Sequence, residues 1–330
     1  MENSGRKKFP LVFAFTAACC VLAAVFSICL GAASLSWSEV LSGSETVSGR
    51  IFFLVRLPRT AACLLSGAGL AVSGALIQGV LANSLASPGI IGVNAGAGLG
   101  VTLCCSLGAI SGWAVAGSAF IGALAAVLTV AIAARRTAAS RSAVILGGVA
   151  VNSFLTAISE AITNLFPEVA ALSADFRAGG FSGVSFTRLA PAGIMIVAAL
   201  AVSLSLSNEL DLLSMGEDIA QGLGLPVKKV RTVFLVLAAL LAGASVSFAG
   251  LLGFAGLIIP NMARRIVGSE SKRLLPLCTV GGAAFVTVCD CAARLMFAPF
   301  EIPAGIVMSV VGAPFFIFLL LKRKGGHSPG

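Results

Sequence analysis

The sequence predicts an all-α protein that crosses a membrane many times, and three observations carry this prediction. Of its 330 residues, 58% are hydrophobic and 11% are charged, whereas about a quarter of a soluble protein is charged. Apolar runs near the roughly 20 residues of a bilayer-spanning helix recur along the chain. The 38 glycines fit helices that pack closely in lipid, because small residues let neighbouring helices approach.

The net charge of +9 could indicate a nucleic-acid partner, but the positions of the basic residues argue against one. Most of them lie in clusters beside apolar runs, which is the positive-inside pattern of cytoplasmic loops. The clusters are Arg6–Lys8, Arg135–Arg141, Lys228–Arg231, Arg264–Arg273 and Lys322–Lys324. We therefore expect a lipid bilayer as partner, no nucleic acid, and both termini in the cytoplasm.

Ten apolar segments are predicted to span the bilayer, since two cytoplasmic termini require an even number; eight is the rival count. They cover residues 9–31, 57–81, 89–108, 112–134, 142–166, 189–206, 230–249, 251–267, 274–296 and 302–321. The first segment follows a basic N-terminus, as the core of a signal peptide does. It is longer than the usual core of about 7–15 residues, so we interpret it as a retained span.

The second and third segments enclose the most unusual stretch of the chain. RLPR at 56–59 leads into a Gly/Ala/Ser/Leu helix with one polar residue, Gln78, and the helix breaks at Asn83–Gly89. A second break is expected at Gly250–Gly256, because residues 230–263 are too long for one crossing and short for two. Interrupted helices often line a translocation path.

Alternation of the spans assigns a side to each connecting segment. The outer segments are 34–56, 167–188 and 297–301, and the inner ones are 82–88, 135–141, 207–229 and 264–273. Three arginines, Arg56, Arg59 and Arg294, then lie at the outer side, where few other cations remain.

The inner segment 207–229 is polar enough to leave the bilayer. Glu217 and Asp218 follow Gly216 and would occupy the first turn of a helix, where carboxylates are favoured. The Gly- and Pro-containing residues 222–226 would end that helix. We expect a short amphipathic helix that docks a cytoplasmic partner, with an ordinary solvated loop as the alternative.

Four stretches in order along the chain resemble the FecCD family of ABC importer permeases, which carry iron–siderophore complexes, haem or cobalamin. They are RLPR at 56–59, SGALIQGVLANSLASPGIIGVNAGAGLG at 73–100, GFAGLIIPNMARRIVG at 253–268 and EIPAGIVMSVVGAPFFIFLL at 301–320. In addition, GEDIAQGLG at 216–224 resembles the coupling-helix motif of such permeases. The resemblance covers essentially the whole chain.

The resemblance implies the type II ABC importer permease fold, as one transmembrane domain over residues 1–330, in a prokaryotic cytoplasmic membrane. It also implies three kinds of partner: a second permease copy, identical or related, two cytoplasmic ATPase subunits, and an extracytoplasmic substrate-binding protein. The chain has no G-x-x-x-x-G-K-[ST] loop. It should therefore be a non-catalytic subunit without a cofactor of its own, whose ATPase partners use the ATP and Mg.

The matched motifs imply roles for single residues. Arg56, Arg59 and Arg294 would meet carboxylates of the binding protein, with anchoring to lipid headgroups as the alternative for the first two. The residues implied in ATPase coupling are Gly216, Glu217, Asp218, Ala220 and Gly224. Those implied in the gate or pathway are Asn83, Leu85, Ser142 and Gln78. Helix capping is the alternative for Asn83, and interhelical hydrogen bonding is the alternative for Gln78.

Two departures from the family and one competing function remain. Asn261 stands where the family usually has His, which puts any role that needs protonation there in doubt, and segment 175–182 lacks the usual Trp.

The alternative function is a secondary transporter that moves protons or ions through Glu160 and Asp290. However, Asp290 stands four residues before Arg294, and we expect the two to pair. The nine cysteines form no paired C-x-x-C framework, so no metal site is expected.

Overall fold

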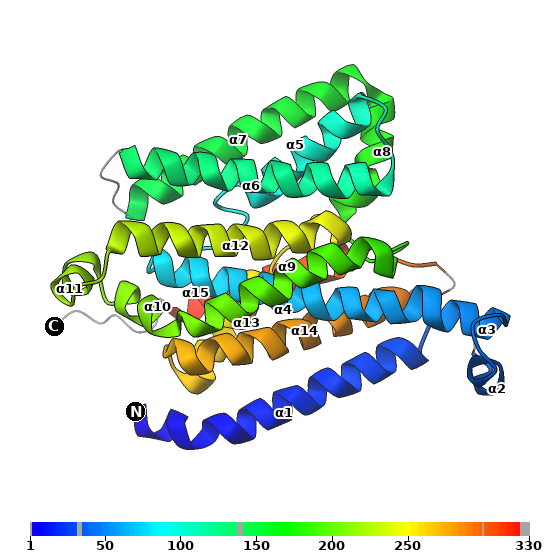
Figure 1. Cartoon of the computed structure of the whole chain (residues 1–330), viewed down its shortest axis with the longest axis horizontal. Helices are drawn as coiled ribbons and strands as arrows, with labels where there is room; N and C mark the ends of the chain where they lie inside the picture. Colours follow the sequence, from blue (N-terminus) through cyan, green and yellow to red (C-terminus); the bar gives the residue numbers. More distant parts are fainter. Residues whose placement is uncertain (1, 32–34, 137–140, 299, 324–330) are drawn as a thin grey trace.

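The computed structural model describes residues 2–31, 35–136, 141–298 and 300–323, and every regular element in these ranges is a helix. Figure 1 shows the long helices running roughly along the length of the molecule. Their bounds are α1 (Glu2–Cys29), α2 (Trp37–Leu41), α3 (Val47–Arg50), the π-helix η1 (Ile51–Arg56), α4 (Leu57–Val80), α5 (Val93–Ser106), α6 (Gly112–Arg136), α7 (Arg141–Leu165), α8 (Pro167–Ala178), α9 (Phe186–Ser205), α10 (Ser207–Ser214), α11 (Glu217–Gly222), α12 (Val227–Ala249), α13 (Ala255–Val267), α14 (Ser271–Leu295) and α15 (Ala304–Arg323).

Each of the ten predicted spans corresponds to a helix. These helices are α1, α4, α5, α6, α7, α9, α12, α13, α14 and α15. Within the described ranges, seven helical stretches are long and apolar enough to cross a membrane, and α3, η1 and α4 are continuous in one of them. α5 and residues 304–318 of α15 are shorter apolar helices, and α13 has 13 residues. The all-α membrane fold is confirmed, while ten crossings stay a prediction.

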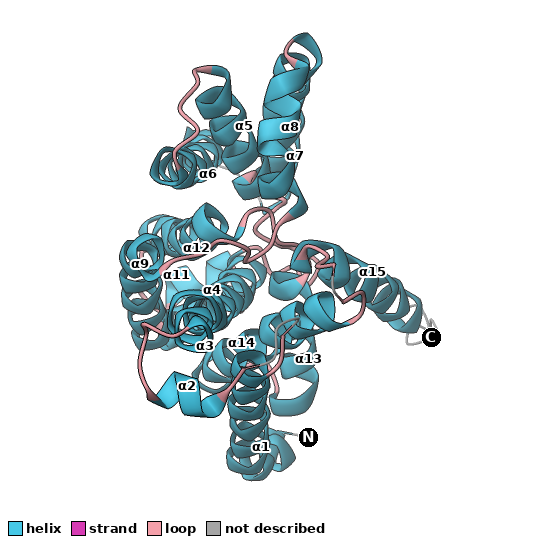
Figure 2. Cartoon of the chain, turned by 90° about the vertical axis from the view of Figure 1, so that its right-hand side faces the viewer, coloured by secondary structure: helices cyan, strands magenta, loops and turns pink. Residues whose placement is uncertain are grey.

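Helix α4 lies at the centre of one group of helices, as the end-on view of Figure 2 shows. It contacts α14, α12, α13 and α9, and its glycines explain how closely they approach. A Cβ on Gly67 would lie 2.2 Å from the carbonyl oxygen of Gly282 in α14. A Cβ on Gly74 would lie 1.8 Å from that of Gly256 in α13. Only glycine fits at these crossings, which accounts for a composition that is poor for a soluble helix.

Helices α5, α6, α7 and α8 form a second group, at the top of Figure 1. α5 and α6 also cross at glycines, because a Cβ on Gly96 would lie 2.2 Å from the carbonyl oxygen of Gly122. The two groups meet where α6 packs on α12. Close helix contact through small residues therefore organises both halves of the fold.

Both predicted breaks exist. Residues 81–92 form turns between α4 and α5, and the chain leaves α12 at Gly250, which has a φ of 69°. Phe254, directly before α13, also has a positive φ of 64°, which is uncommon for a residue other than glycine. Its ring lies against Gly312 of α15, where a Cβ would be 2.3 Å from Cγ of Phe254. Packing against α15 thus holds the strained residue at the break.

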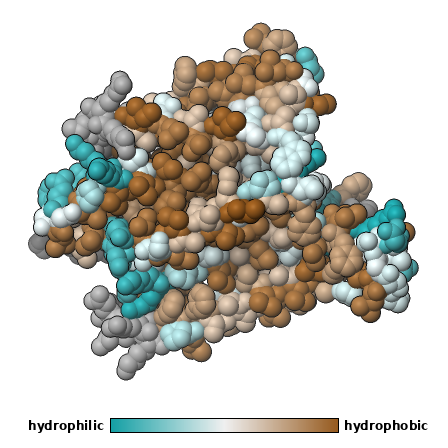
Figure 3. Space-filling view, viewed as in Figure 1, coloured by the Kyte–Doolittle hydropathy of each residue, from teal (hydrophilic) through white to brown (hydrophobic). Residues whose placement is uncertain are grey.

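The connecting segments gather at two ends of the molecule, as the alternation of spans predicted. α2, α3 and α8 lie at one end, called the outer end below, and the start of α1 lies with α10 and α11 at the other, the inner end (Figure 1). Figure 3 shows a hydrophobic belt between more hydrophilic ends. Which end faces the cytoplasm stays a prediction. The segments expected as outer loops contain the unpredicted helices α2, α3, η1 and α8.

Candidate functional site

The three arginines predicted to dock a partner converge near the outer ends of α1, α4 and α14, and all three are buried. Their exposed fractions are 4% for Arg56, 7% for Arg59 and 3% for Arg294. Arg59 lies in the first turn of α4, and Arg294 lies in the last turn of α14. Cations this far from solvent need internal partners, and the structure supplies them.

Asp290 is the partner that Arg59 and Arg294 share. The Nε of Arg59 donates to both carboxylate oxygens at 3.1 Å, and its Nη2 donates to Oδ1 at 2.9 Å. The Nε of Arg294 lies 3.1 Å from Oδ2, and Asp290 is fully buried. The pairing of Asp290 with Arg294, predicted from their spacing, is confirmed, and Arg59 joins them from α4. A second carboxylate, Glu301, accepts from Nη1 of Arg59 at 2.7 Å.

Arg56 and Arg294 hold the end of α1. Arg56 donates from Nη1 to the carbonyl oxygens of Ile28 and Cys29 at 2.9 and 2.6 Å. Arg294 donates to the carbonyl oxygen of Leu30 at 3.1 Å. α1 ends at Cys29, and the last carbonyls of a helix lack helical partners and favour a nearby cation. This capping was not predicted, and contact of these arginines with a binding protein stays a prediction.

Asn83 folds the inner turn that follows α4. Its Oδ1 accepts the backbone N–H of Leu85 at 2.9 Å, a local bond typical of Asn in turns. The backbone N–H of Asn83 donates to the carbonyl oxygen of Gln78 at 3.1 Å. Asn83 thus closes the end of the helix, as its capping alternative requires, while a gate role for Asn83 and Leu85 stays a prediction. Ser142 belongs to α7, but its side chain lies outside the described part of the structure.

Helix α13 contacts the same turn through polar side chains. Asn261 donates from Nδ2 to the carbonyl oxygen of Ser84 at 2.8 Å. Arg264, nearly one turn further on, donates to the side-chain oxygen of Gln78. The amide nitrogen of Gln78 donates in turn to the carbonyl oxygen of Gly256 at 3.3 Å. The interhelical alternative for Gln78 is therefore confirmed, and Asn261 holds the turn without a titratable group.

A cavity of about 250 Å³ lies between this turn and the start of the coupling segment. Its lining includes Asn83, Arg264, Ser214 and Ser271. Beside it, Oδ1 of Asp211 accepts the backbone N–H of Ser271 at 2.9 Å and its hydroxyl at 2.6 Å. Since Ser271 is the first residue of α14, these bonds fix α10 to the start of α14.

The predicted coupling segment contains two short helices, α10 and α11, and α11 carries the motif at 216–224. Gly216 and Gly224 have φ values of 128° and 83°, which glycine adopts without the penalty of a Cβ. Ala220 is fully buried, so one side of α11 packs on the protein. The predicted short helix is confirmed, and its contact with an ATPase stays a prediction.

The two acidic residues of α11 differ in their surroundings. Glu217 forms an ion pair with Arg231 of α12, whereas Asp218 is exposed. Two exposed apolar side chains, Ile219 and Leu223, are four residues apart at the end of α11, which places them on one face of the helix. Met215 is also exposed, in the turn that precedes α11. We call Met215, Ile219 and Leu223, which are 61%, 54% and 63% exposed, the α11 ridge. The ridge was not predicted from the sequence, although the four-residue spacing of Ile219 and Leu223 is visible there.

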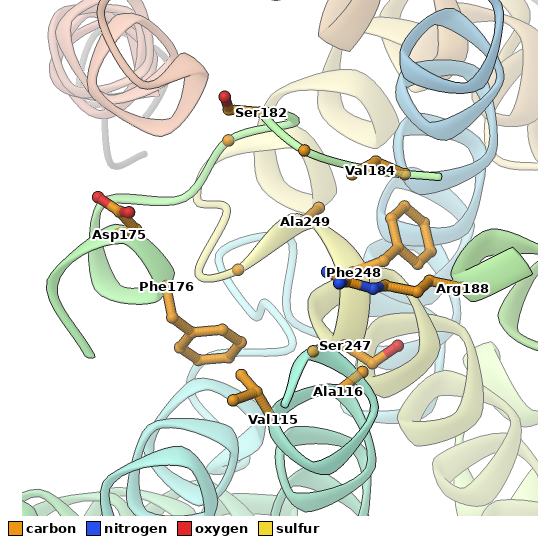
Figure 4. Close-up of a pocket in the computed structure, with 14 residues that line it drawn as sticks. Val115, Ala116, Asp175, Phe176, Ser182, Val184, Arg188, Ser247, Phe248 and Ala249 are labelled. Atoms are coloured by element: carbon orange, nitrogen blue, oxygen red, sulfur yellow. The ribbon is translucent and has the colours of Figure 1, made fainter. Parts of the chain in front are cut away.

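An outer pocket of about 230 Å³ lies between the starts of α6 and α9 and the ends of α8 and α12. Figure 4 shows Arg188 reaching into it beside Phe248, with Phe176 near Val115. The guanidinium lies against Gly112, where a Cβ would be 2.1 Å from Cζ of Arg188. The pocket was not predicted, and Arg188 is an outer cation that the sequence argument passed over.

The structure offers no support for a proton or ion path through the two carboxylates considered for one. Glu160 is exposed on α7, and Asp290 is buried between two arginines. In the part of the chain that the structure describes, no three His, Cys, Asp or Glu side chains cluster so that they could hold a metal ion.

Comparison with known proteins places these features in a family. The model of the FecCD transport family matches residues 19–322. The iron(3+)-hydroxamate import system permease protein FhuB of Bacillus subtilis is 35% identical, over 97% of this chain and 86% of the relative. The vitamin B12 import system permease protein BtuC of Citrobacter koseri is 37% identical, over 92% of each. A solved structure, described as an inward-facing conformation of a metal-chelate type ABC transporter, covers 95% of this chain with a TM-score of 0.86 and 30% identity. This chain belongs to the FecCD transport family.

Proposed function

We propose that this chain is the membrane-spanning permease subunit of an ABC importer that carries an iron(III)–siderophore complex, with haem or cobalamin as the other substrates of the class. The observation that carries the proposal is the match over nearly the whole chain to permeases for iron(3+)-hydroxamate and vitamin B12. Specificity then resides mainly in the binding protein that delivers the complex.

Two ATPase subunits supply the energy, because the chain itself has no phosphate-binding loop. Each docks on a copy of α11 at the inner end. The α11 ridge offers the apolar anchor residues that a groove in a protein partner takes up at i and i+4 spacing. Asp218 adds an exposed charge beside the ridge, which orients the docking partner.

Movement of α11 reaches the inner turn through neighbouring elements. α10 is fixed to α14 by Asp211 and Ser271. α13, which precedes α14, holds the turn through Asn261 and the end of α4 through Arg264. ATP binding closes the ATPases, shifts α10 and α11, and changes which end of the path is open. Two remote sites are thereby coupled, as an importer requires.

The complete importer contains a second permease copy, identical or closely related, with the path between the two copies. The binding protein docks at the outer end. In this arrangement both termini of the chain lie in the cytoplasm, and the complex resides in the cytoplasmic membrane of a prokaryote. The basic clusters beside the inner ends of the helices support this orientation.

The docking surface is tested by Ile219→Glu in the α11 ridge. A charge at an apolar anchor that a partner buries is strongly unfavourable, so the ATPase subunit should be lost when the complex is purified from its own membranes. Glu217 is a poorer target, because its ion pair with Arg231 would break as well.

The matched control is Leu41→Glu, the same change at the opposite end, where the side chain is 87% exposed. That variant should retain the ATPase at the wild-type ratio, as measured on a gel of the purified complex. Full retention by the Ile219→Glu variant would show that the ridge is not the docking surface.

A further inference from the structure

We propose that Glu301 is an internal carboxylate that occupies Arg59 at the position a carboxylate of the extracytoplasmic binding protein takes during docking. Release of Glu301 is then part of capture, and the Glu301–Arg59 pair lowers the affinity of the resting permease for its partner. The inference rests on the proposed function, because it needs a binding protein that docks at the outer end.

The two carboxylates on Arg59 are not equivalent. Asp290 makes three close contacts with the guanidinium and has no exposed surface. Glu301 makes one contact, at 2.7 Å from Nη1, and its side chain is 38% exposed. Asp290 therefore fixes Arg59 from the protein interior, and Glu301 pairs with Nη1 from the more exposed side. Only Glu301 can exchange with an incoming group without unpacking the helices.

Arg59 depends on anionic partners. It pairs with Asp290, which it shares with Arg294, and with Glu301. A guanidinium left without a partner at a buried site is costly. Arg59 is therefore expected to trade one carboxylate for another, so that Nη1 stays paired while Glu301 turns into water.

The backbone around Glu301 permits this exchange. Glu301 lies in the non-helical segment between α14 and α15, so its side chain can turn without unwinding either helix. The next residue stays tied to α14, because the N–H of Ile302 donates to the carbonyl oxygen of Ala293 at 3.2 Å. The exchange is therefore local to the side chain and its immediate neighbours.

The surface beside Glu301 suits a protein partner. Phe297 and Phe300 in the same segment are 54% and 77% exposed. Exposed aromatic side chains around a charged group are typical of protein interfaces. The surface thus combines apolar contact area with a guanidinium that needs a carboxylate, which fits a protein that presents Asp or Glu beside apolar side chains.

The test is Glu301→Gln, which keeps the shape and an oxygen for Nη1 but removes the competing charge. The probe is the binding protein captured by the wild-type permease–ATPase complex from its own cells, and the readout is its Kd for the complex in lipid nanodiscs. The expected result is a fall in Kd of about two- to fivefold, the range for a partly exposed ion pair.

The matched control is Glu45→Gln, which removes the same charge at the outer end from a side chain that is 92% exposed and paired with Arg50. It should leave Kd unchanged. An unchanged or raised Kd in Glu301→Gln, with the wild type still capturing the protein, would overturn this inference alone. An equal fall in the Glu45→Gln variant would also overturn it. Failure of the wild type to capture any binding protein would instead overturn the proposed function.

Discussion

At the scale of single residues, Arg56, Arg59, Asp290, Arg294 and Glu301 form the outer cluster. This cluster links helices and also lies near the proposed docking surface, and the sequence alone did not show that the same side chains serve both purposes. Asp290 pairs Arg59 of α4 with Arg294 of α14, and Arg294 with Arg56 caps the end of α1. One set of side chains thereby ties three helices together near the surface where a partner is proposed to dock. A change in the pairing of any of these side chains therefore alters the contacts among α1, α4 and α14.

Asp290→Asn tests the structural part of this arrangement. Removal of the carboxylate leaves the buried Arg294 without a carboxylate partner and Arg59 with Glu301 alone, which is expected to lower the free energy of unfolding by about 3–5 kcal/mol. The measurement is denaturant unfolding of the purified protein in mild detergent. Asp175→Asn, at an exposed position, is the control and should unfold as the wild type does. Equal stability of Asp290→Asn and wild type would contradict a structural role for Asp290.

Spacing along one helix was sufficient to predict the pairing of Asp290 with Arg294, because residues four apart share a helix face. The bond from Arg59 to Glu301 joins positions 242 residues apart, and no local pattern carries that information. The burial of the docking arginines was missed for the same reason. Their partners come from helices whose packing the sequence does not determine locally.

At the scale of elements, α4 packs so closely against its neighbouring helices that the backbones are in contact. Gly67 faces α14 and Gly74 faces α13. α13 is then linked to α4 a second time, through Gln78 and Arg264. These contacts couple α4 and α13 along their length, so a shift of α13 is passed to the turn that follows α4.

Gly74→Ala is expected to push α13 away from α4, because the new methyl group would lie 1.8 Å from a carbonyl oxygen. The loss of stability should be about 1–3 kcal/mol, as for an overpacked core, measured as detergent unfolding. Gly98→Ala in α5 is the control, since nothing lies within 4 Å of its added methyl group. If both variants lose the same stability, the crossing of α4 and α13 is looser than the structure shows.

The long helices were predictable because an apolar run of membrane length has one common explanation. The short helices α2, α3 and α8 were not, since they lie in connecting segments and carry too few residues for a hydropathy signal. Their positions depend on the helices they contact. The breaks at 81–92 and at Gly250 were predictable from glycine, proline and polar residues in otherwise apolar runs.

At the scale of the whole molecule, the chain places a charged cluster at its outer end and two short helices at its inner end, with α4 extending from the first toward the second (Figure 1). The cluster suits capture of an acidic partner, and the α11 ridge suits an apolar groove. Neither end carries a catalytic group in the mechanism proposed here. We therefore propose that ATP hydrolysis by a separate subunit drives transport through this chain.

Uptake into proteoliposomes that contain the purified permease–ATPase complex tests this dependence on ATP. The substrates are a ferric hydroxamate siderophore, haem and cobalamin, each supplied with the binding protein that the complex captures, with and without ATP on the ATPase side. We expect uptake of one of them that requires both ATP and the binding protein and that persists when a protonophore collapses the proton gradient. Uptake that proceeds without ATP and stops with the protonophore would show instead that the chain is a secondary transporter.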